Sequence, residues 1–116
     1  MRDLLNRLAE RAPHPDRLAF GKIVVHLQRP ELVSRIYDYV MYRVPYVIED
    51  QEETPPRRTP VGFVFATAPR FTDQELAGKT AAEVEAMWRA RFEEALRAEF
   101  SAVVNVYRMN KELFRP

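Results

Sequence analysis

The chain has 116 residues, of which 47% are hydrophobic, and this suits one domain built around one core. Its 18 basic and 17 acidic side chains leave a net charge of +1, which excludes a strong overall field toward nucleic acid or anionic membranes. The lack of cysteine excludes disulfides and thiolate chemistry. No apolar run approaches the about 20 residues that span a bilayer, and the N-terminus is unlike a signal peptide, so we expect neither a membrane nor a secreted protein.

The first elements expected are a short helix and a long strand. Residues 2–12 place leucines and alanines at helical spacing, and Pro13 and Pro15 end this amphipathic helix. From Leu18 to Gln28, β-forming residues alternate, which predicts one long strand with a bulge at Gly21.

The next segment carries two competing patterns. Pro30 suits the first turn of a helix, and apolar residues follow at helical steps, which predicts a helix from about Glu31 to Asp38. The strand formers that follow leave residues 36–44 open to either helix or strand. A strand from about Arg43 to Glu49 comes next, and Pro45 puts it at a sheet edge or beside a bulge.

A hairpin with a long tip is then expected. Residues 50–60 contain no apolar anchor and predict an exposed loop. Val61 to Ala68 has apolar residues in both alternating sets, which predicts a strand buried on both faces and paired antiparallel with the previous one. Thr72 with Glu75 is a capping-box pattern, and Gly78 closes the resulting one-turn helix.

The longest predicted helix lies in the C-terminal half. Thr80 followed by Glu83 is a second capping box, which marks the start of the helix. Apolar residues then recur at steps of three and four to Phe100, so we expect one buried stripe that includes Trp88. After Phe100 the residues alternate, which favours a final strand over a continued helix at residues 103–109.

Together these elements predict an α+β fold formed by residues 1–116 as a single domain. A mostly antiparallel sheet of about four strands packs against the long amphipathic helix, and a short helix lies at the N-terminus.

Few residues suit catalysis. The possible soft metal ligands are His14 and His26, and they are not part of a ligand cluster. Ser34 and Ser101 lie outside any nucleophile elbow, and the three glycines form no phosphate-binding loop. We therefore expect no cofactor, no metal site and no enzymatic activity.

A charged loop follows the Arg43–Glu49 strand. Its carboxylates are Glu49, Asp50, Glu52 and Glu53. A metal-dependent nuclease keeps such ligands after a strand, but it also needs a strand lysine, for which Lys22 is the only candidate. The favoured interpretation is a solvated loop. Because the acidic half precedes a basic half with Arg57 and Arg58, the loop is also a candidate contact in a self-complementary or head-to-tail assembly.

A second candidate surface combines tyrosines with arginines. Its members are Arg35, Tyr37, Tyr39, Tyr42, Arg43 and Tyr46. Such side chains stack on single-stranded nucleic acid and are also enriched in protein interfaces. We expect about half of these tyrosines to lie in the core, as is usual for strand residues. The balanced net charge favours a protein partner over nucleic acid.

The segment Arg43-Val-Pro-Tyr-Val-Ile-Glu, entering a hairpin with a charged tip and followed by a helix and a closing strand, resembles the plan of small phage tail-terminator and head-tail completion proteins. The resemblance concerns topology over most of the chain. It implies a non-catalytic ring-forming protein of a virion, in which residues 50–60 contact a neighbouring subunit or the tube. The lack of cysteine also suits a cytoplasmic location.

The sequence therefore predicts a non-enzymatic interaction or assembly protein that binds protein partners, self-associates, and in its most specific form belongs to a virion. The alternative is a small regulatory protein that binds nucleic acid or the transcription machinery through its Tyr/Arg surface.

Overall fold

The computed structural model describes residues 1–37 and 39–114. The elements in chain order are α1 (Arg2–Arg11), β1 (Arg17–Phe20), β2 (Ile23–Leu27), β3 (Glu31–Ile36), β4 (Tyr39–Asp50), β5 (Arg57–Arg58), β6 (Gly62–Thr67), α2 (Asp73–Leu76), α3 (Ala81–Met109) and the 3-10 helix η1 (Lys111–Phe114).

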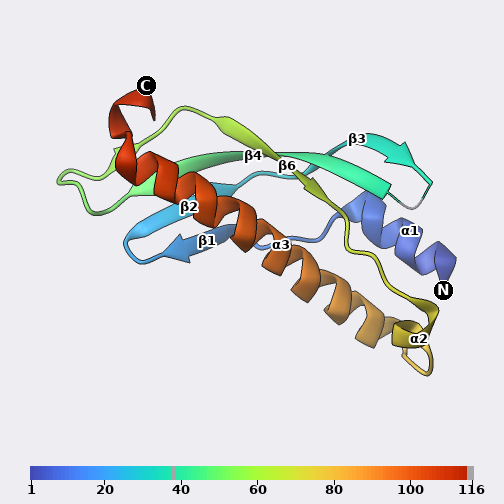
Figure 1. Ribbon diagram of the computed structural model, residues 1–116. Coiled ribbons are helices and arrows are strands. Elements are labelled where there is room, and N and C mark those ends of the chain that lie inside the picture. The colour runs from blue at the N-terminus through green and yellow to red at the C-terminus, as the bar shows by residue number, and fades with distance from the viewer. Residues whose placement is uncertain (38, 115–116) are drawn as a thin grey trace.

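An antiparallel sheet packs against the long C-terminal helix, as the sequence predicted. The central strand β4 pairs with β2 and β3 along one edge, and with β5 and β6 along the other. β1 pairs with the outer edge of β2. Figure 1 shows α1 and α3 on the same side of this sheet, with α3 running diagonally across it. The fold is therefore α+β, with its core between one face of the sheet and the helices.

α3 begins where the capping box predicted but continues further than expected. Thr80 accepts from the Glu83 N–H, and the Glu83 carboxylate accepts from the Thr80 N–H. The buried stripe is formed by Val84, Trp88, Phe92, Leu96, Phe100, Val104 and Tyr107. The predicted final strand at residues 103–109 is wrong, because Val104 and Tyr107 extend this stripe at helical spacing and their burial outweighs the strand propensity of valine.

Two further predictions fail in the first half of the chain. The strand from Leu18 to Gln28 is a hairpin of β1 and β2, with its turn at Gly21, whose φ of 65° favours glycine. The helix from Glu31 to Asp38 is wrong over residues 31–36, which form β3; Asp38 lies outside the described residues. The open question at residues 36–44 is resolved for the described ones: residues 39–44 belong to β4, which begins at Tyr39 rather than Arg43.

Pro45 lies in the central strand rather than at an edge. The Pro45 carbonyl accepts from the Gln28 N–H. Because the nitrogen and carbonyl of one strand residue point to the same side, the Pro45 nitrogen also faces the gap between the end of β2 and the start of β3. The missing N–H of Pro45 therefore faces a break in the neighbouring strand, which is why a proline is tolerated here.

The predicted hairpin of β4 with β6 is confirmed, but the burial expected for β6 and for the loop is wrong in part. Small residues of β6 face α3, whereas Phe63 and Phe65 are about half exposed on the other face. In the loop expected at residues 50–60, Asp50 ends β4 and is buried, and Thr59 is buried with its hydroxyl accepting from the Ile48 N–H.

Candidate functional site on the open face of the sheet

The face of the sheet that points away from α1 and α3 is covered by no described element (Figure 1). Because side chains alternate along a strand, the even-numbered residues of β4 are buried against the helices and the odd-numbered ones point away. The paired residues of the neighbouring strands share these faces. We call the uncovered surface the open face, formed by Val24, His26, Glu31, Ser34, Ile36, Tyr39, Met41, Arg43, Pro45, Val47, Glu49, Arg58, Phe63, Phe65 and Thr67.

Large apolar side chains gather on one half of the open face. Their exposed fractions are 62% for Ile36, 57% for Tyr39, 39% for Met41, 55% for Phe63 and 51% for Phe65. We call these five residues the apolar patch. With about half of about 200 Å² exposed for each large side chain, the patch presents about 500 Å². An exposed apolar area of this size on a monomer is often functional.

Arginines frame the apolar patch. The Arg43 guanidinium lies 5.4 Å from the centre of the Phe63 ring, and its Nε donates to Glu31 at 2.9 Å. The Arg70 guanidinium lies 4.3 Å from the centre of the Tyr39 ring. Guanidinium groups at these distances are attracted to the faces of aromatic rings. The patch is therefore bordered by arginines that contact its aromatic side chains.

The other half of the open face is polar and internally paired. Glu49 contacts His26 at 3.2 Å and Arg58 at 2.9 Å, and it accepts from the Gln51 amide at 2.7 Å. The Gln51 amide first, and then the Arg58 guanidinium, lower the pKa of Glu49 to about 2. Glu49 is consequently a paired carboxylate throughout the neutral pH range.

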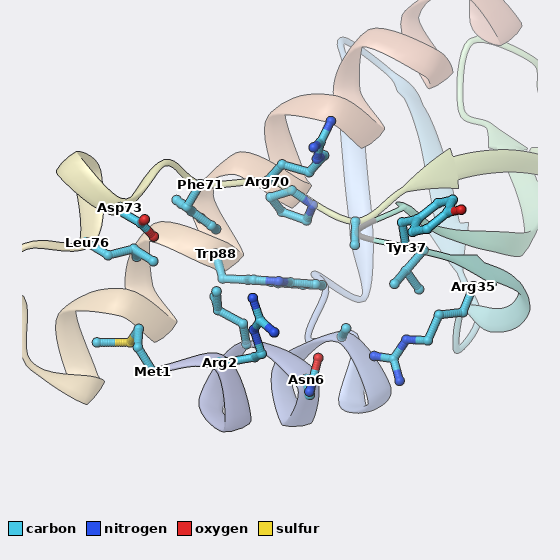
Figure 2. Close-up of a pocket in the computed structure, with 15 residues that line it drawn as sticks. Met1, Arg2, Asn6, Arg35, Tyr37, Arg70, Phe71, Asp73, Leu76 and Trp88 are labelled. Atoms are coloured by element: carbon cyan, nitrogen blue, oxygen red, sulfur yellow. The ribbon is translucent and has the colours of Figure 1, made fainter.

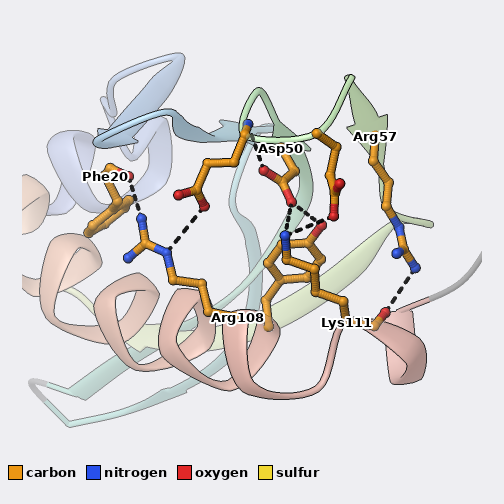
Figure 3. Close-up of polar contacts among 8 residues, drawn as sticks. Phe20, Asp50, Arg57, Arg108 and Lys111 are labelled. Carbon is orange, nitrogen blue, oxygen red and sulfur yellow. Dashed lines mark hydrogen bonds and ion pairs between the residues drawn. The ribbon is translucent and has the colours of Figure 1, made fainter. Parts of the chain in front are cut away.

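Residues of the charged loop bind to the end of α3 and to η1. Glu53 lies 2.9 Å from the Lys111 amine, and Arg57 donates to the Lys111 carbonyl at 2.9 Å (Figure 3). Glu52 lies 3.5 Å from Arg108. These predicted contact residues of the loop are thus engaged within one copy of the chain.

Asp50 is the buried centre of this network. Its carboxylate accepts from the Tyr107 hydroxyl at 2.7 Å and from the Lys111 amine at 2.9 Å (Figure 3). Burial alone would raise the pKa of Asp50, but the hydrogen bonds from Lys111 and Tyr107 outweigh it and lower the pKa. Burial, together with the nearby Asp50 carboxylate, raises the pKa of Tyr107 to about 12. The arrangement joins the charged loop to the end of α3 and to η1.

The predicted Tyr/Arg surface is divided between two sides of the sheet. Tyr39 and Arg43 are on the open face, whereas Tyr42 and Tyr46 are 1% and 7% exposed and belong to the core. The surface prediction is therefore wrong for these two, and the expectation that about half of the tyrosines lie in the core is confirmed. The Tyr42 hydroxyl donates to the Ala9 carbonyl of α1, and burial raises the pKa of Tyr42 to about 12. Successive side chains of a strand point to opposite faces, so Tyr42 and Tyr46, at even-numbered positions of β4, face the helices, whereas Tyr39 and Arg43 face away from them.

Arg35 and Tyr37, the remaining predicted residues, line a pocket of about 260 Å³ beside α1. Figure 2 shows Arg2 and Asn6 extending from α1 toward Trp88, which forms the floor, and Arg35 entering from β3. The pocket thus combines the positive charges of Arg2 and Arg35 with the apolar ring of Trp88. It is slightly smaller than the about 300–1,000 Å³ usual for ligand sites.

The sequence did not identify Phe63, Phe65, Ile36 and Met41 as surface residues. A signal was present in β6, where Phe63 and Phe65 alternate with Gly62 and Ala66. Small residues on one face allow a helix to approach closely, so the aromatic face is the one left outside. At Gly62 an added Cβ would lie 3.0 Å from the ring of Tyr46, its cross-strand partner in β4, so a side chain here would collide with the core ring of the neighbouring strand.

Comparisons with protein-family models, with curated proteins and with solved structures found no significant match for this chain. Within residues 1–37 and 39–114, no three His, Asp or Glu side chains are grouped so that they could hold a metal ion. In the same part of the chain, no helix has the length and apolar character required to cross a lipid bilayer.

Proposed function

We propose that this chain is a non-enzymatic protein–protein interaction protein that works as a homo-oligomer, with the open face as a contact surface between copies. The observation that supports this proposal is the apolar patch on an uncovered sheet face. An antiparallel sheet with one solvated face normally carries polar residues there, whereas this one carries Ile36, Met41 and three aromatic side chains.

The composition and size of the patch suit a protein interface. Aromatic residues, methionine and arginine are the types enriched at such interfaces. Two open faces packed about 10 Å apart would form the interior of a β-sandwich. Burying the patch of both copies would remove about 1,000 Å² from water, which reaches the lower end of the range for specific interfaces once the surrounding residues are added.

A ring or tube is the most specific form of this proposal, as in the phage tail-terminator and head-tail completion proteins. The resemblance to their plan is limited to the elements before the C-terminal helix, because the expected closing strand is part of α3. In such an assembly the open face supplies one contact of each copy, and a second, different contact completes the ring or tube. Glu53 and Arg57 of the charged loop already bind Lys111 of the same copy, so we assign the contact to the open face rather than to the loop.

Binding of single-stranded nucleic acid is the alternative, because exposed Tyr39, Phe63 and Phe65 on an open sheet could stack on bases. We favour a protein partner because Arg43 and Arg58 are each paired with a carboxylate of the same copy. This pairing weakens the phosphate attraction that dominates nucleic-acid affinity. Nucleic-acid binding predicts oligonucleotide affinity that falls steeply with salt, measured by fluorescence anisotropy.

The solution mass of two matched variants tests the main proposal. Ile36→Glu places a charge in the apolar patch, and Leu113→Glu places one at an apolar residue of η1 that is also exposed, 77% against 62% for Ile36. Light scattering across a concentration series should show oligomers for the unmodified chain and Leu113→Glu, and a smaller species for Ile36→Glu. A monomer at every concentration, or equal masses for all three proteins, would contradict the proposal.

A further inference from the structure

The outer edge of β6 has backbone groups without partners among the described residues. The Ala68 N–H donates to the Val40 carbonyl, and the Thr59 N–H donates to the Ile48 carbonyl. The even-numbered residues of β4 therefore direct their N–H and C=O groups toward β6 and the residues on either side of it. In the antiparallel ladder the even-numbered residues of β6 face them in return. The N–H and C=O groups of Phe63, Phe65 and Thr67 therefore point outward, away from β4.

This edge lacks the features that usually protect an edge strand. β6 has six residues, GFVFAT, with no charge, no proline and a regular register against β4. The opposite edge of the sheet is formed by β1 and β3, and both differ from β6. β1 has four residues, begins with Arg17, and its Phe20 carbonyl accepts from Arg108. β3 carries Glu31 and Arg35, and its register against β4 is irregular between Leu32 and Ser34. Natural edge strands are commonly shortened, charged or covered, since an open apolar edge pairs with another chain.

We propose that the outer edge of β6 binds β6 of a second copy, antiparallel, with Phe65 on the two-fold axis. This inference rests on the proposed self-association and adds a second contact to it. The two sheets become one continuous sheet, and the apolar patches of both copies lie on the same side of it. Phe65 then faces its own counterpart, and Phe63 faces Thr67 of the other copy.

The second copy fits this edge in charge and in geometry. β6 is neutral, and the arginines before it are engaged within their own copy, Arg58 with Glu49 and Arg57 with the Lys111 carbonyl. A two-fold axis at Phe65 pairs all three outward-pointing residues of each strand, and each pair exchanges both of its hydrogen bonds. A shift of the axis would pair Thr67 with Val61, which lies outside β6.

Cross-linking through introduced cysteines tests the register, because the chain has no cysteine of its own. Phe65→Cys would bring two Cα atoms to about 5.5 Å, within the about 4.4–6.8 Å that a disulfide spans. Phe63→Cys is the matched control on the same face and strand. In the proposed register, residue 63 faces residue 67 of the other copy, so the two cysteines at position 63 would lie four residues apart along the strand, about 13 Å at about 3.3 Å per residue. Oxidation should yield a covalent dimer with Phe65→Cys only, and a dimer with Phe63→Cys alone, or with neither variant, would overturn the proposal.

Changes to the backbone separate this contact from the open-face contact. Thr67→Pro removes one outward N–H and leaves the apolar patch intact, whereas Thr67→Ala keeps that N–H. In light scattering, Ile36→Glu should leave a dimer of twice 13.6 kDa, and adding Thr67→Pro, but not Thr67→Ala, should shift it to the monomer mass. If Ile36→Glu alone gives a monomer, the edge contact is wrong and the open-face contact stands. If Ile36→Glu changes nothing and Thr67→Pro alone gives a monomer, the open-face contact is wrong.

Discussion

Asp50→Asn should destabilise the protein by removing a buried charge from the network that closes the sheet onto α3. Asp50 is fully buried and accepts from Tyr107, from Lys111 and from the Glu52 N–H. Breaking a buried ion pair costs about 3–5 kcal/mol. Because Lys111 is partly exposed and keeps its contact with Glu53, we expect a loss of about 2–3 kcal/mol in the free energy of unfolding.

The effect of Asp50→Asn should depend on pH in a defined direction. The folded-state pKa of Asp50 is lowered, so its contribution is present above the unfolded value of about 3.9 and is lost as pH falls through the folded pKa. The pKa of Lys111 is raised, so its contribution is present below about 10.4 and is lost as pH rises through the folded pKa. The difference between the variant and the unmodified chain should therefore be constant between about pH 5 and 9 and shrink in stronger acid.

Urea unfolding at one fixed protein concentration, followed by the fluorescence of the single tryptophan, measures these differences. Glu53→Gln is the control, because Glu53 contacts the same amine at 2.9 Å from an exposed position and should cost less than about 1 kcal/mol. Equal losses for Asp50→Asn and Glu53→Gln would refute the reasoning. A loss for Asp50→Asn that persists unchanged below the folded pKa of the carboxyl would refute it as well.

Three further substitutions, one of them with a matched control, test the packing. Trp88→Ala should lower the free energy of unfolding by about 3–5 kcal/mol in a urea titration followed by circular dichroism, because the 1% exposed side chain leaves a core cavity. Val104→Lys should prevent stable folding, whereas Val106→Lys, at a 49% exposed residue of the same helix, should change the melting temperature little; equal effects would indicate a strand. Gly62→Ala should cost about 1–3 kcal/mol, since its Cβ would lie 3.0 Å from the Tyr46 ring, and an unchanged melting temperature would show that the ring moves freely.

The parts of the fold that follow from local chemistry were predicted from the sequence. Both capping boxes, at Thr72 and Thr80, need only residues three positions apart, and both form. The short N-terminal helix and the start of α3 follow from their own periodicity. The antiparallel pairing of β4 with β6 follows from the loop that joins them.

The errors came from segments in which two local patterns compete. β3 has apolar residues at helical spacing, yet pairing with β4 makes it a strand whose Leu32 and Val33 remain about half exposed. Residues 103–109 have strand propensity, yet the core continues the helix through Val104. In each case contacts outside the segment determine the outcome, the hairpin with β4 for β3 and the packed core for residues 103–109, and the propensity of the segment alone does not include those contacts.

The candidate site was predicted only in part for the same reason. The sequence pointed to a surface of tyrosines and arginines, and Tyr39 and Arg43 do lie on the open face. It also included Tyr42 and Tyr46, because single-sequence patterning gives the period of a strand but not which of its two faces meets the helix. Phe63 and Phe65 were missed because an apolar residue in a strand is normally assigned to the core.

The sequence by itself thus determined the class of the fold, the long capped helix and the existence of a hairpin, all of which arise from interactions within a few residues along the chain. The tertiary structure alone decided that both helices cover the same side of the sheet, and that Asp50 is buried beneath Lys111. It also left Ile36, Met41, Phe63 and Phe65 facing water. A sheet has two faces and this chain has one long helix to cover them, so the uncovered face becomes evident only when the elements are packed together.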